Sequence, residues 1–292
     1  MIQTRYIDGR KVAARIEEET RQEIAALGMT PGLGVILVGD DPASHLYVRL
    51  KRKACERAGI RFELKDFPDD AQEDELLDAI RALNARDDIH AILVQLPLPE
   101  AFDTDRVIRA MDPAKDVDGF HPDNIRRIDE SDGDGFPGLT EGIIELIRET
   151  GADFAGKHAV IAANSATFAL PLEVRLRQLG ALPEFASGDA LDLASRFKEA
   201  DILITALGRP GLVTGDDIKP EAIIIDVGTT RVGDTVVGDA DAESVEGTAG
   251  WITPVPGGVG PVTVAMLLKN VVKLAKEMHP STTLRAGKRQ MR

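Results

Sequence analysis

Short apolar runs alternate with amphipathic stretches along most of the chain. The apolar runs, each of strand length, are residues 34–38, 91–95, 159–162, 201–205 and 222–227. They lack a polar face, which is typical of a parallel sheet covered on both sides. Apolar residues at helical spacing lie between and beside them, at residues 12–27, 43–58, 73–84, 141–149 and 170–179. The alternation predicts an α/β fold with crossover helices between parallel strands.

Two breaks in this pattern predict two lobes. A single core stops growing at roughly 250–300 residues, and this chain has 292. Residues 116–138 are rich in Asp, Gly and Pro, as an interdomain connection would be. The segment TPVPGGVGP precedes a last apolar-striped helix at residues 262–276, which we expect to return to the first lobe. We therefore predict one domain from residues 1–120 plus 262–292, a second from residues 121–261, and a cleft between them.

Composition excludes several classes of protein. The formal net charge of −14 argues against general nucleic-acid binding, which depends on neutralised phosphates. No apolar run approaches the roughly 20 residues that span a membrane, and the start of the chain lacks a secretory signal pattern, so a cytoplasmic protein is expected. Cys55 is the single cysteine, which excludes an intrachain disulfide, and we expect it to pack in a core. The basic residues 281–292 are expected to form a frayed tail.

A possible site begins with Tyr47 and Lys51, which are four residues apart in DPASHLYVRLKRKACERAGI. Pro42 marks the start of a helix, so both side chains should lie on one face, one turn apart. Lys51 also begins a run of three basic residues with Arg52 and Lys53, and a solvated cluster explains such a run equally well. Spacing alone does not select Lys51.

Further polar residues follow an apolar strand and a turn. Gln95 ends a strand and precedes LPLP, a place where ligands gather in open α/β sheets, although a strand-end amide also satisfies loop backbone. Asp116 and Asp118 form a paired-carboxylate loop with His121 nearby. Two carboxylates without further ligands are weak evidence for a metal site, and none is predicted.

Five segments resemble the signature blocks of the methylenetetrahydrofolate dehydrogenase/cyclohydrolase family. They are YVRLKRKACERAGI, ILVQLPLP, KDVDGFHPDN, IDVG and ITPVPGGVGPVTVAMLLKN, and they occur in the order and spacing of that family. The resemblance covers the chain from about residue 6 to residue 276. It implies an N-terminal α/β folate domain and a C-terminal Rossmann-like dinucleotide domain.

The resemblance also implies roles for the residues of the first lobe. Lys51 is the catalytic lysine and Gln95 orients it, while Tyr47 stacks on the aminobenzoyl ring and Asp118 binds the pterin. These residue types suit a folate, because a carboxylate accepts the N–H donors of a pterin and a tyrosine faces an aryl ring. An ordinary lysine is protonated near neutrality, so we expect the bound folate, with Arg52 and Lys53, to lower the pKa of Lys51.

A glycine-rich loop is the last part of the expected folate site. It contains Pro256, Gly257, Gly258 and Val259, and its glycines let backbone come close to a ligand.

The dinucleotide lobe departs from the family pattern G-R-S-x-x-V-G-x-P. Residues 162–171 read AANSATFALP, without the two glycines and without the Arg. Asn164 and Ser165 can still donate hydrogen bonds to a phosphate or ribose, and Thr229 lies in a strand-end cofactor loop, where Thr-Thr replaces the usual Ile-Asn. The cofactor is therefore NADP or NAD. Little advantage for NADP is expected unless Arg209 or a residue of 187–189 replaces the missing cation.

Three functions remain open on the sequence. The first is oxidation of 5,10-methylenetetrahydrofolate with a nicotinamide cofactor, followed by hydrolysis of the methenyl product to 10-formyltetrahydrofolate. The second is a cyclohydrolase alone, because that half-reaction needs no nucleotide. The third is a non-catalytic folate-binding paralogue, against which the presence of Lys51 argues. The resemblance also implies a homodimer acting on tetrahydrofolate derivatives.

Overall fold

The structure is a computed structural model that describes residues 2–130 and 136–279. The chain folds into two compact units. Among the described residues, the first unit contains 14–126 and 264–279, and the second contains 2–13, 127–130 and 136–263. The basic tail at residues 281–292, and part of the expected interdomain connection, lie outside the described residues.

The first unit is built on a three-stranded parallel sheet with the order β3-β2-β4. Its strands are β2 (Gly32–Val38), β3 (Arg61–Phe67) and β4 (Ala91–Val94). Three helices belong wholly to this unit: α2 (Pro42–Ala58), α3 (Glu73–Asn84) and α4 (Thr104–Arg109). Three others belong to it in part: α1 (Gly9–Leu27), α5 (Pro122–Glu130) and α10 (Val259–Met278).

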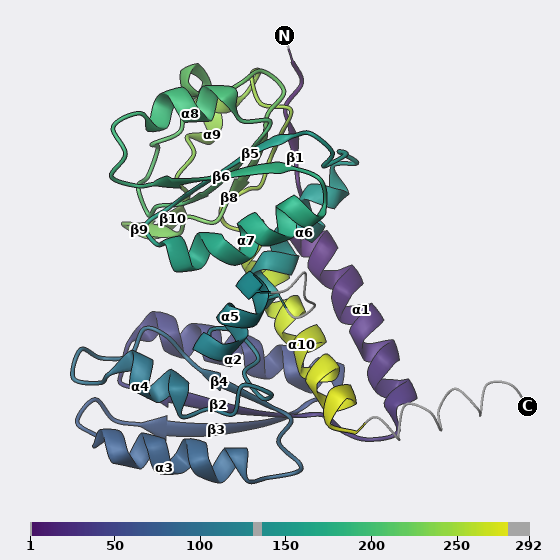
Figure 1. Ribbon diagram of the computed structural model, residues 1–292, viewed down its shortest axis with the longest axis vertical. Helices are drawn as coiled ribbons and strands as arrows, with labels where there is room; N and C mark the ends of the chain where they lie inside the picture. Colours follow the sequence, from purple (N-terminus) through teal and green to yellow (C-terminus); the bar gives the residue numbers. More distant parts are fainter. Residues whose placement is uncertain (1, 131–135, 280–292) are drawn as a thin grey trace, which may run out of the picture. The chain divides into compact units, whose positions relative to one another are not determined.

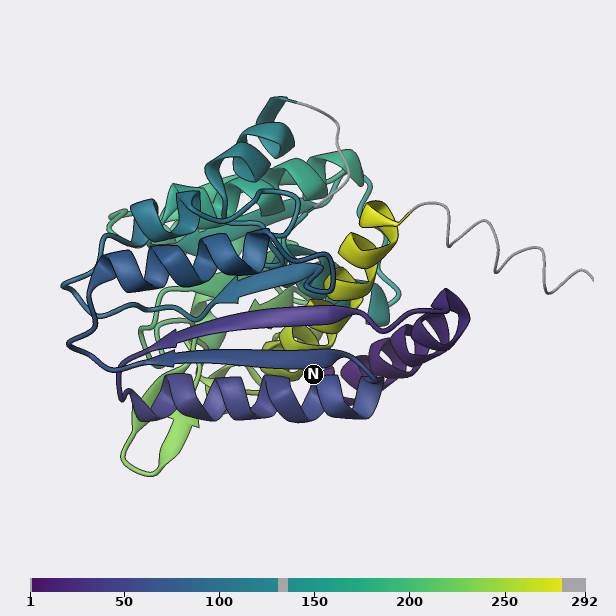
Figure 2. The same ribbon diagram turned by 90° about the horizontal axis from the view of Figure 1, so that it is seen from below.

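Alternation along β2 divides the core of this unit into two layers. Leu33, Val35 and Leu37 pack with buried residues of α2 and α10. Ile36 and Val38 face the opposite way and pack with α3 and α4. Successive side chains of a strand point to opposite faces, so a strand that is apolar throughout needs cover on both. Figures 1 and 2 show α2 and α3 on opposite sides of this sheet.

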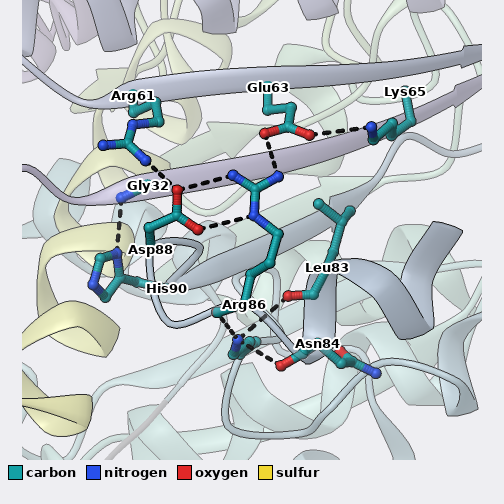
Figure 3. A network of polar contacts seen from close by, with 10 residues as sticks. Gly32, Arg61, Glu63, Lys65, Leu83, Asn84, Arg86, Asp88 and His90 are labelled. Atoms are coloured by element: carbon teal, nitrogen blue, oxygen red, sulfur yellow. Dashed lines mark hydrogen bonds and ion pairs between the residues drawn. The ribbon is translucent and has the colours of Figure 1, made fainter.

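The edge strand β3 carries charged residues that enter a polar network (Figure 3). The Arg86 guanidinium donates to Glu63 at 2.7 Å and to the two oxygens of Asp88 at 2.9 Å each. Asp88 also pairs with Arg61, and Glu63 with Lys65 at 3.2 Å. These contacts tie the edge of the sheet to the loop that enters β4.

The second unit contains a six-stranded parallel sheet with the order β1-β11-β8-β7-β5-β6. The strands are β1 (Arg5–Tyr6), β5 (His158–Ala163), β6 (Leu182–Ser187), β7 (Ile202–Ala206), β8 (Ile223–Asp226) and β11 (Trp251–Ile252). Helices α6 (Gly138–Glu149) and α7 (Ala166–Gln178) cover one face, and α8 (Leu193–Glu199) and α9 (Ala242–Val245) the other (Figure 1). A short 3-10 helix (Gly215–Asp217) and an antiparallel hairpin of β9 (Thr230–Val232) and β10 (Thr235–Val237) complete it.

The N-terminus is where the structure differs from the predicted domain boundaries. Residues 1–120 were assigned to the first domain, yet β1 pairs with β11 and belongs to the second unit. The strand has two exposed residues, so its sequence contains no apolar run, and a pairing partner far along the chain decides its place. Helix α10 likewise begins at Val259 and is divided between the units after Thr263, close to the predicted position.

The α/β class is confirmed, since each unit has a parallel sheet with helices on both faces. The predicted strands and helices all occur, within a few residues of their expected ends. Among the described residues, none of the helices is long and apolar enough to cross a membrane.

Candidate active site

Helix α2 presents Tyr47 and Lys51 on one face. It begins at Pro42, and the carboxylate of Asp41 caps it by accepting from the Ser44 amide at 2.8 Å. It ends at Gly59, whose φ of 83° is the left-handed conformation that glycine adopts without strain. The buried residues Val48, Ala54, Cys55 and Ala58 hold the helix on the sheet, and Lys51 lies among them on the helix surface. Tyr47 lies one turn before Lys51 at the edge of this buried face and is 42% exposed, as a ring available to a ligand.

Lys51 meets Gln95 across the end of the sheet. The Lys51 Nζ donates to Gln95 Oε1 at 2.9 Å. Gln95 follows β4 directly and is buried, and its Nε2 donates to the carbonyl of Leu96 at 2.7 Å. Because the Gln95 amide nitrogen is already engaged, its oxygen faces the lysine. The predicted contact between these two side chains is present in the structure.

Burial acts on the pKa values of both charged groups at this end of the sheet. It lowers the pKa of Lys51, while the negative charge of Asp118 opposes that shift. It raises the pKa of Asp118 to about 6, an effect that Lys51 opposes and Asp116 increases. Desolvation disfavours the charged form of each group. The lysine and the carboxyl group thus titrate closer to neutrality than their free counterparts.

The neighbouring basic residues are not the origin of the lysine shift. Arg52 and Lys53 are exposed, and the lowered pKa of Lys51 comes from its own burial. Cys55 lies in the core of the first unit, and burial raises the pKa of its thiol to about 12. A buried neutral thiol supports the packing role expected for Cys55 and excludes an activated one.

Asp116 shapes the loop that positions Asp118. Its carboxylate accepts from the amides of Gly119 at 3.0 Å and His121 at 2.7 Å, and from the Asn124 side chain at 3.0 Å. The two carboxylates of KDVDGFHPDN therefore have different surroundings, since Asp116 is committed to loop backbone. Within residues 2–130 and 136–279, no three His, Cys, Asp or Glu side chains gather as a metal site.

Asn270 is a supporting residue that the sequence analysis missed. Its side-chain Nδ2, on α10, donates to the carbonyl of Val117 at 3.1 Å, next to Asp118. Val117 itself lies in the core beside β4. The available signal was an amide next to the apolar stripe of this helix. Helix α10 thereby fixes the loop from which Asp118 projects.

In the second unit, Asn164 and Ser165 lie where β5 gives way to α7. Both are exposed, and Ser165 is the N-cap residue without a side-chain hydrogen bond to the helix. The Asn164 Nδ2 donates to the carbonyl of Leu207 at 3.0 Å. Thr229 is exposed beyond β8. The free amides at the start of a helix can bind a phosphate.

Gly188 directly follows β6, and side chains from the loops after β5 and β7 lie beside it. The Arg209 Nη1 donates to the Gly188 carbonyl at 2.9 Å, so a cation lies beside the end of β6. A Cβ on Gly188 would lie 2.5 Å from Asn164 Oδ1, which excludes larger residues there. The strand ends, the helix start and the nearby cation fit a dinucleotide, which binds at the carboxyl ends of strands in this fold class.

The loop of Pro256, Gly257, Gly258 and Val259 belongs to the second unit. Gly257 has a φ of 114°, which L side chains rarely adopt. A Cβ on Gly258 would lie 2.7 Å from the carbonyl oxygen of Pro254. The fold of the loop itself therefore requires both glycines, independently of any ligand. Close approach to a ligand, favoured by the sequence, is therefore not needed to explain these two glycines.

Comparison with known proteins agrees with this geometry. The family model of the tetrahydrofolate dehydrogenase/cyclohydrolase catalytic domain matches residues 7–118, and that of its NAD(P)-binding domain matches residues 137–279. The bifunctional protein FolD of Moorella thermoacetica is 46% identical over 274 residues, which are 92% of this chain and 98% of that protein.

Two crystal structures extend the likeness to the whole fold. The bifunctional FolD of Campylobacter jejuni has a TM-score of 0.89 and 37% identity, and covers 94% of this chain and 99% of its own. A Trypanosoma brucei methylenetetrahydrofolate dehydrogenase-cyclohydrolase, complexed with NADP cofactor and inhibitor, has a TM-score of 0.91 and 36% identity, and covers 95% and 99%. This chain belongs to the tetrahydrofolate dehydrogenase/cyclohydrolase family.

Proposed function

We propose that this bifunctional enzyme centres its folate chemistry on Lys51. The enzyme oxidises 5,10-methylenetetrahydrofolate to the methenyl form with a nicotinamide cofactor, and hydrolyses that product to 10-formyltetrahydrofolate. The observation that carries the assignment is the 2.9 Å hydrogen bond from Lys51 to Gln95. Burial also lowers the pKa of this lysine. A solvated surface lysine would have neither feature.

Lys51 acts on the proton of the attacking water. Hydrolysis adds water to the methenyl carbon, and the proton that leaves this water needs an acceptor near neutral pH. A lowered pKa raises the neutral fraction of Lys51, whose Nζ then has a lone pair for that proton. Gln95 accepts one N–H of the same nitrogen and so turns the lone pair toward the substrate. Gln95 is thus a positioning residue in this reaction.

Two further groups bind the folate. Tyr47 stacks on the aminobenzoyl ring with its exposed face. The ionised carboxylate of Asp118 accepts hydrogen bonds from the pterin.

The dinucleotide binds in the second unit, beside Asn164, Ser165 and Thr229. When bound, it supplies the hydride acceptor for the oxidation. Ser165 and the first amides of α7 donate to the phosphates, and Arg209 offers a cation at the end of β6. NADP or NAD can serve as the cofactor, and the loop lacks the family's Arg at residues 162–171.

Replacement of Lys51 by Met tests the catalytic role. We expect Lys51→Met to lower cyclohydrolase kcat by roughly 10²–10⁴, the usual worth of general acid–base help. Folate affinity should stay within about tenfold, since Met replaces the aliphatic part of the lysine side chain and removes only its amino group. Lys53→Met, two residues along and exposed, is the matched control and should leave both quantities near the wild-type value. Retained activity in Lys51→Met would refute the assignment.

The same assays separate the two activities. Methenyltetrahydrofolate formation should be detected with NAD or NADP as oxidant. If neither cofactor supports it, the enzyme is a cyclohydrolase alone, and the altered loop at residues 162–171 would be the reason. The proposal extends to a cytoplasmic homodimer, for which light scattering should give about twice the chain mass of 31.5 kDa.

A further inference from the structure

Two buried carboxylates lie at the end of β8, outside the site described above. Asp226 is the last residue of that strand and is 3% exposed, and Asp239 follows the β9–β10 hairpin with no exposed surface. Buried Asp residues are rare, because removing a charge from water is costly unless donors replace the water. The donors in this case are backbone amides of the strand-end loops.

Asp239 holds the loop after β7. Its Oδ2 accepts from the amide of Leu207 at 2.7 Å, and its Oδ1 accepts from the amide of Arg209 at 2.6 Å. Both carboxylate oxygens are therefore used on a single loop. This loop also provides the Leu207 carbonyl that binds Asn164, and the Arg209 side chain that reaches Gly188.

Asp226 holds the segments around Asp239. It accepts from the amides of Gly228 at 2.9 Å, Asp239 at 3.0 Å and Ala240 at 2.8 Å. Its own amide donates to the hydroxyl of Thr253 at 2.8 Å. The bonds run in series, so Asp226 fixes the backbone of Asp239, and Asp239 fixes the loop after β7.

Two glycines provide the space that these carboxylates occupy. A Cβ on Gly228 would lie 2.5 Å from Asp239 Oδ1, and one on Gly238 would overlap Asp226 Oδ2. The glycines of the IDVG and VVGD segments are therefore needed to admit the pair.

The arrangement has a free-energy cost that a simple turn would avoid. Burial, with the nearby charge of Asp239, raises the pKa of Asp226 to about 6. Neutral amide or hydroxyl acceptors can close turns without two like charges in one core. A carboxylate, in contrast, can accept from several amides at once and hold separate loops rigidly.

We propose that Asp226 and Asp239 are a positioning pair for the dinucleotide, holding the loops after β7 and β8 in the geometry that binds it. The inference rests on the proposed cofactor site of the second unit. Neither residue touches the cofactor in this proposal. They act through the backbone of residues 206–211 and 227–230, which gives the fold a preformed site at its strand ends.

Asp239→Asn is the direct test, because the amide is similar in size but can no longer accept from both Leu207 and Arg209. We expect the KM for the dinucleotide to rise at least tenfold, with kcat changed less, while cyclohydrolase kcat/KM stays within about twofold. Asp241→Asn is the matched control. Asp241 is an exposed carboxylate two residues away that accepts from the Ser244 amide, and its loss should change neither activity.

An unchanged KM in a folded Asp239→Asn variant would overturn the proposal. If that variant does not fold, amide hydrogen exchange of the wild-type enzyme without cofactor provides the test. The Leu207 and Arg209 amides should then exchange far more slowly than the exposed turn at Gly233, and equally fast exchange would refute the pair. If the wild-type enzyme oxidises no folate with either cofactor, the dehydrogenase function is refuted. The hydrogen-exchange rates would still show whether Asp239 holds the loop after β7.

Discussion

Asp118 has a pKa much closer to physiological pH than an ordinary aspartate. Burial raises its pKa to about 6, although Lys51 opposes the shift. A carboxyl group with a raised folded-state pKa stabilises the fold below its unfolded pKa, and that contribution is lost as the pH rises through about 6. The ionised form, which we propose accepts hydrogen bonds from the pterin, is therefore obtained at some expense of stability.

We expect folate binding to weaken as the pH falls below about 6, because Asp118 then becomes protonated. Asp118→Asn should raise the KM for folate roughly tenfold to a hundredfold, because it removes a charged hydrogen bond worth about 1.5–3 kcal/mol. The variant should also lose the pH dependence of KM between pH 5 and 7, a window set by that pKa. A wild-type pH profile in the variant would assign the effect to another group.

Arg209 is the residue that bears on cofactor preference. Its side chain donates to Gly188 at the end of β6, where the adenosine ribose lies in Rossmann-like folds. Arg209→Gln should lower NADP affinity about tenfold to a hundredfold, because a charged bond to the 2′-phosphate disappears. NAD has no 2′-phosphate, so its affinity should change by no more than about threefold. Calorimetry with both cofactors measures this.

Arg231→Gln is the control for that experiment. Arg231 also donates to a glycine carbonyl, that of Gly233 at 3.1 Å, but in the exposed hairpin. Equal losses for NAD and NADP in Arg209→Gln would mean that the guanidinium contacts a part common to both cofactors.

At the scale of elements, Lys115 connects the segment that precedes Asp116 and Asp118 to the end of α3. This buried lysine donates to the carbonyls of Asn84 at 2.8 Å and Arg86 at 2.7 Å, and more weakly to that of Leu83 at 3.4 Å. Cations suit the C-terminal end of a helix, where the carbonyls lack intrahelical partners.

Lys115→Met should lower the free energy of unfolding by about 1–3 kcal/mol, because it leaves buried carbonyls without a donor. Lys65→Met is the comparison, since Lys65 pairs with Glu63 at 3.2 Å with 41% of its side chain exposed. A change of about 0–1 kcal/mol is expected there. Urea unfolding measures both, and equal losses would contradict the structural role of Lys115.

At the scale of the whole molecule, each unit has its own sheet, core and part of the chemistry. Lys51, Gln95 and Asp118 lie in the first unit, and the dinucleotide loops lie in the second. Substitutions in the second unit should therefore lower the dehydrogenase activity more than the cyclohydrolase activity, because the cyclohydrolase needs no nucleotide. Paired assays of the two activities measure this difference.

The sequence by itself determined the fold class and the buried strands. Strands β2, β4 and β7 are continuous apolar runs, and Pro42 marks the start of α2, so local pattern was sufficient for them. The spacing of Tyr47 and Lys51 placed them on one face without reference to the rest of the chain.

Tertiary structure decided the remainder. Strand β3 was not predicted, because an edge strand with charged residues gives no apolar signal, and its partners Arg86 and Asp88 are distant in sequence. The two residues of β1 become a strand by pairing with β11. The lowered pKa of Lys51 likewise depends on burial, which no local pattern specifies. The pair of Asp226 and Asp239 depends on amides from separate loops, which only the folded chain brings together.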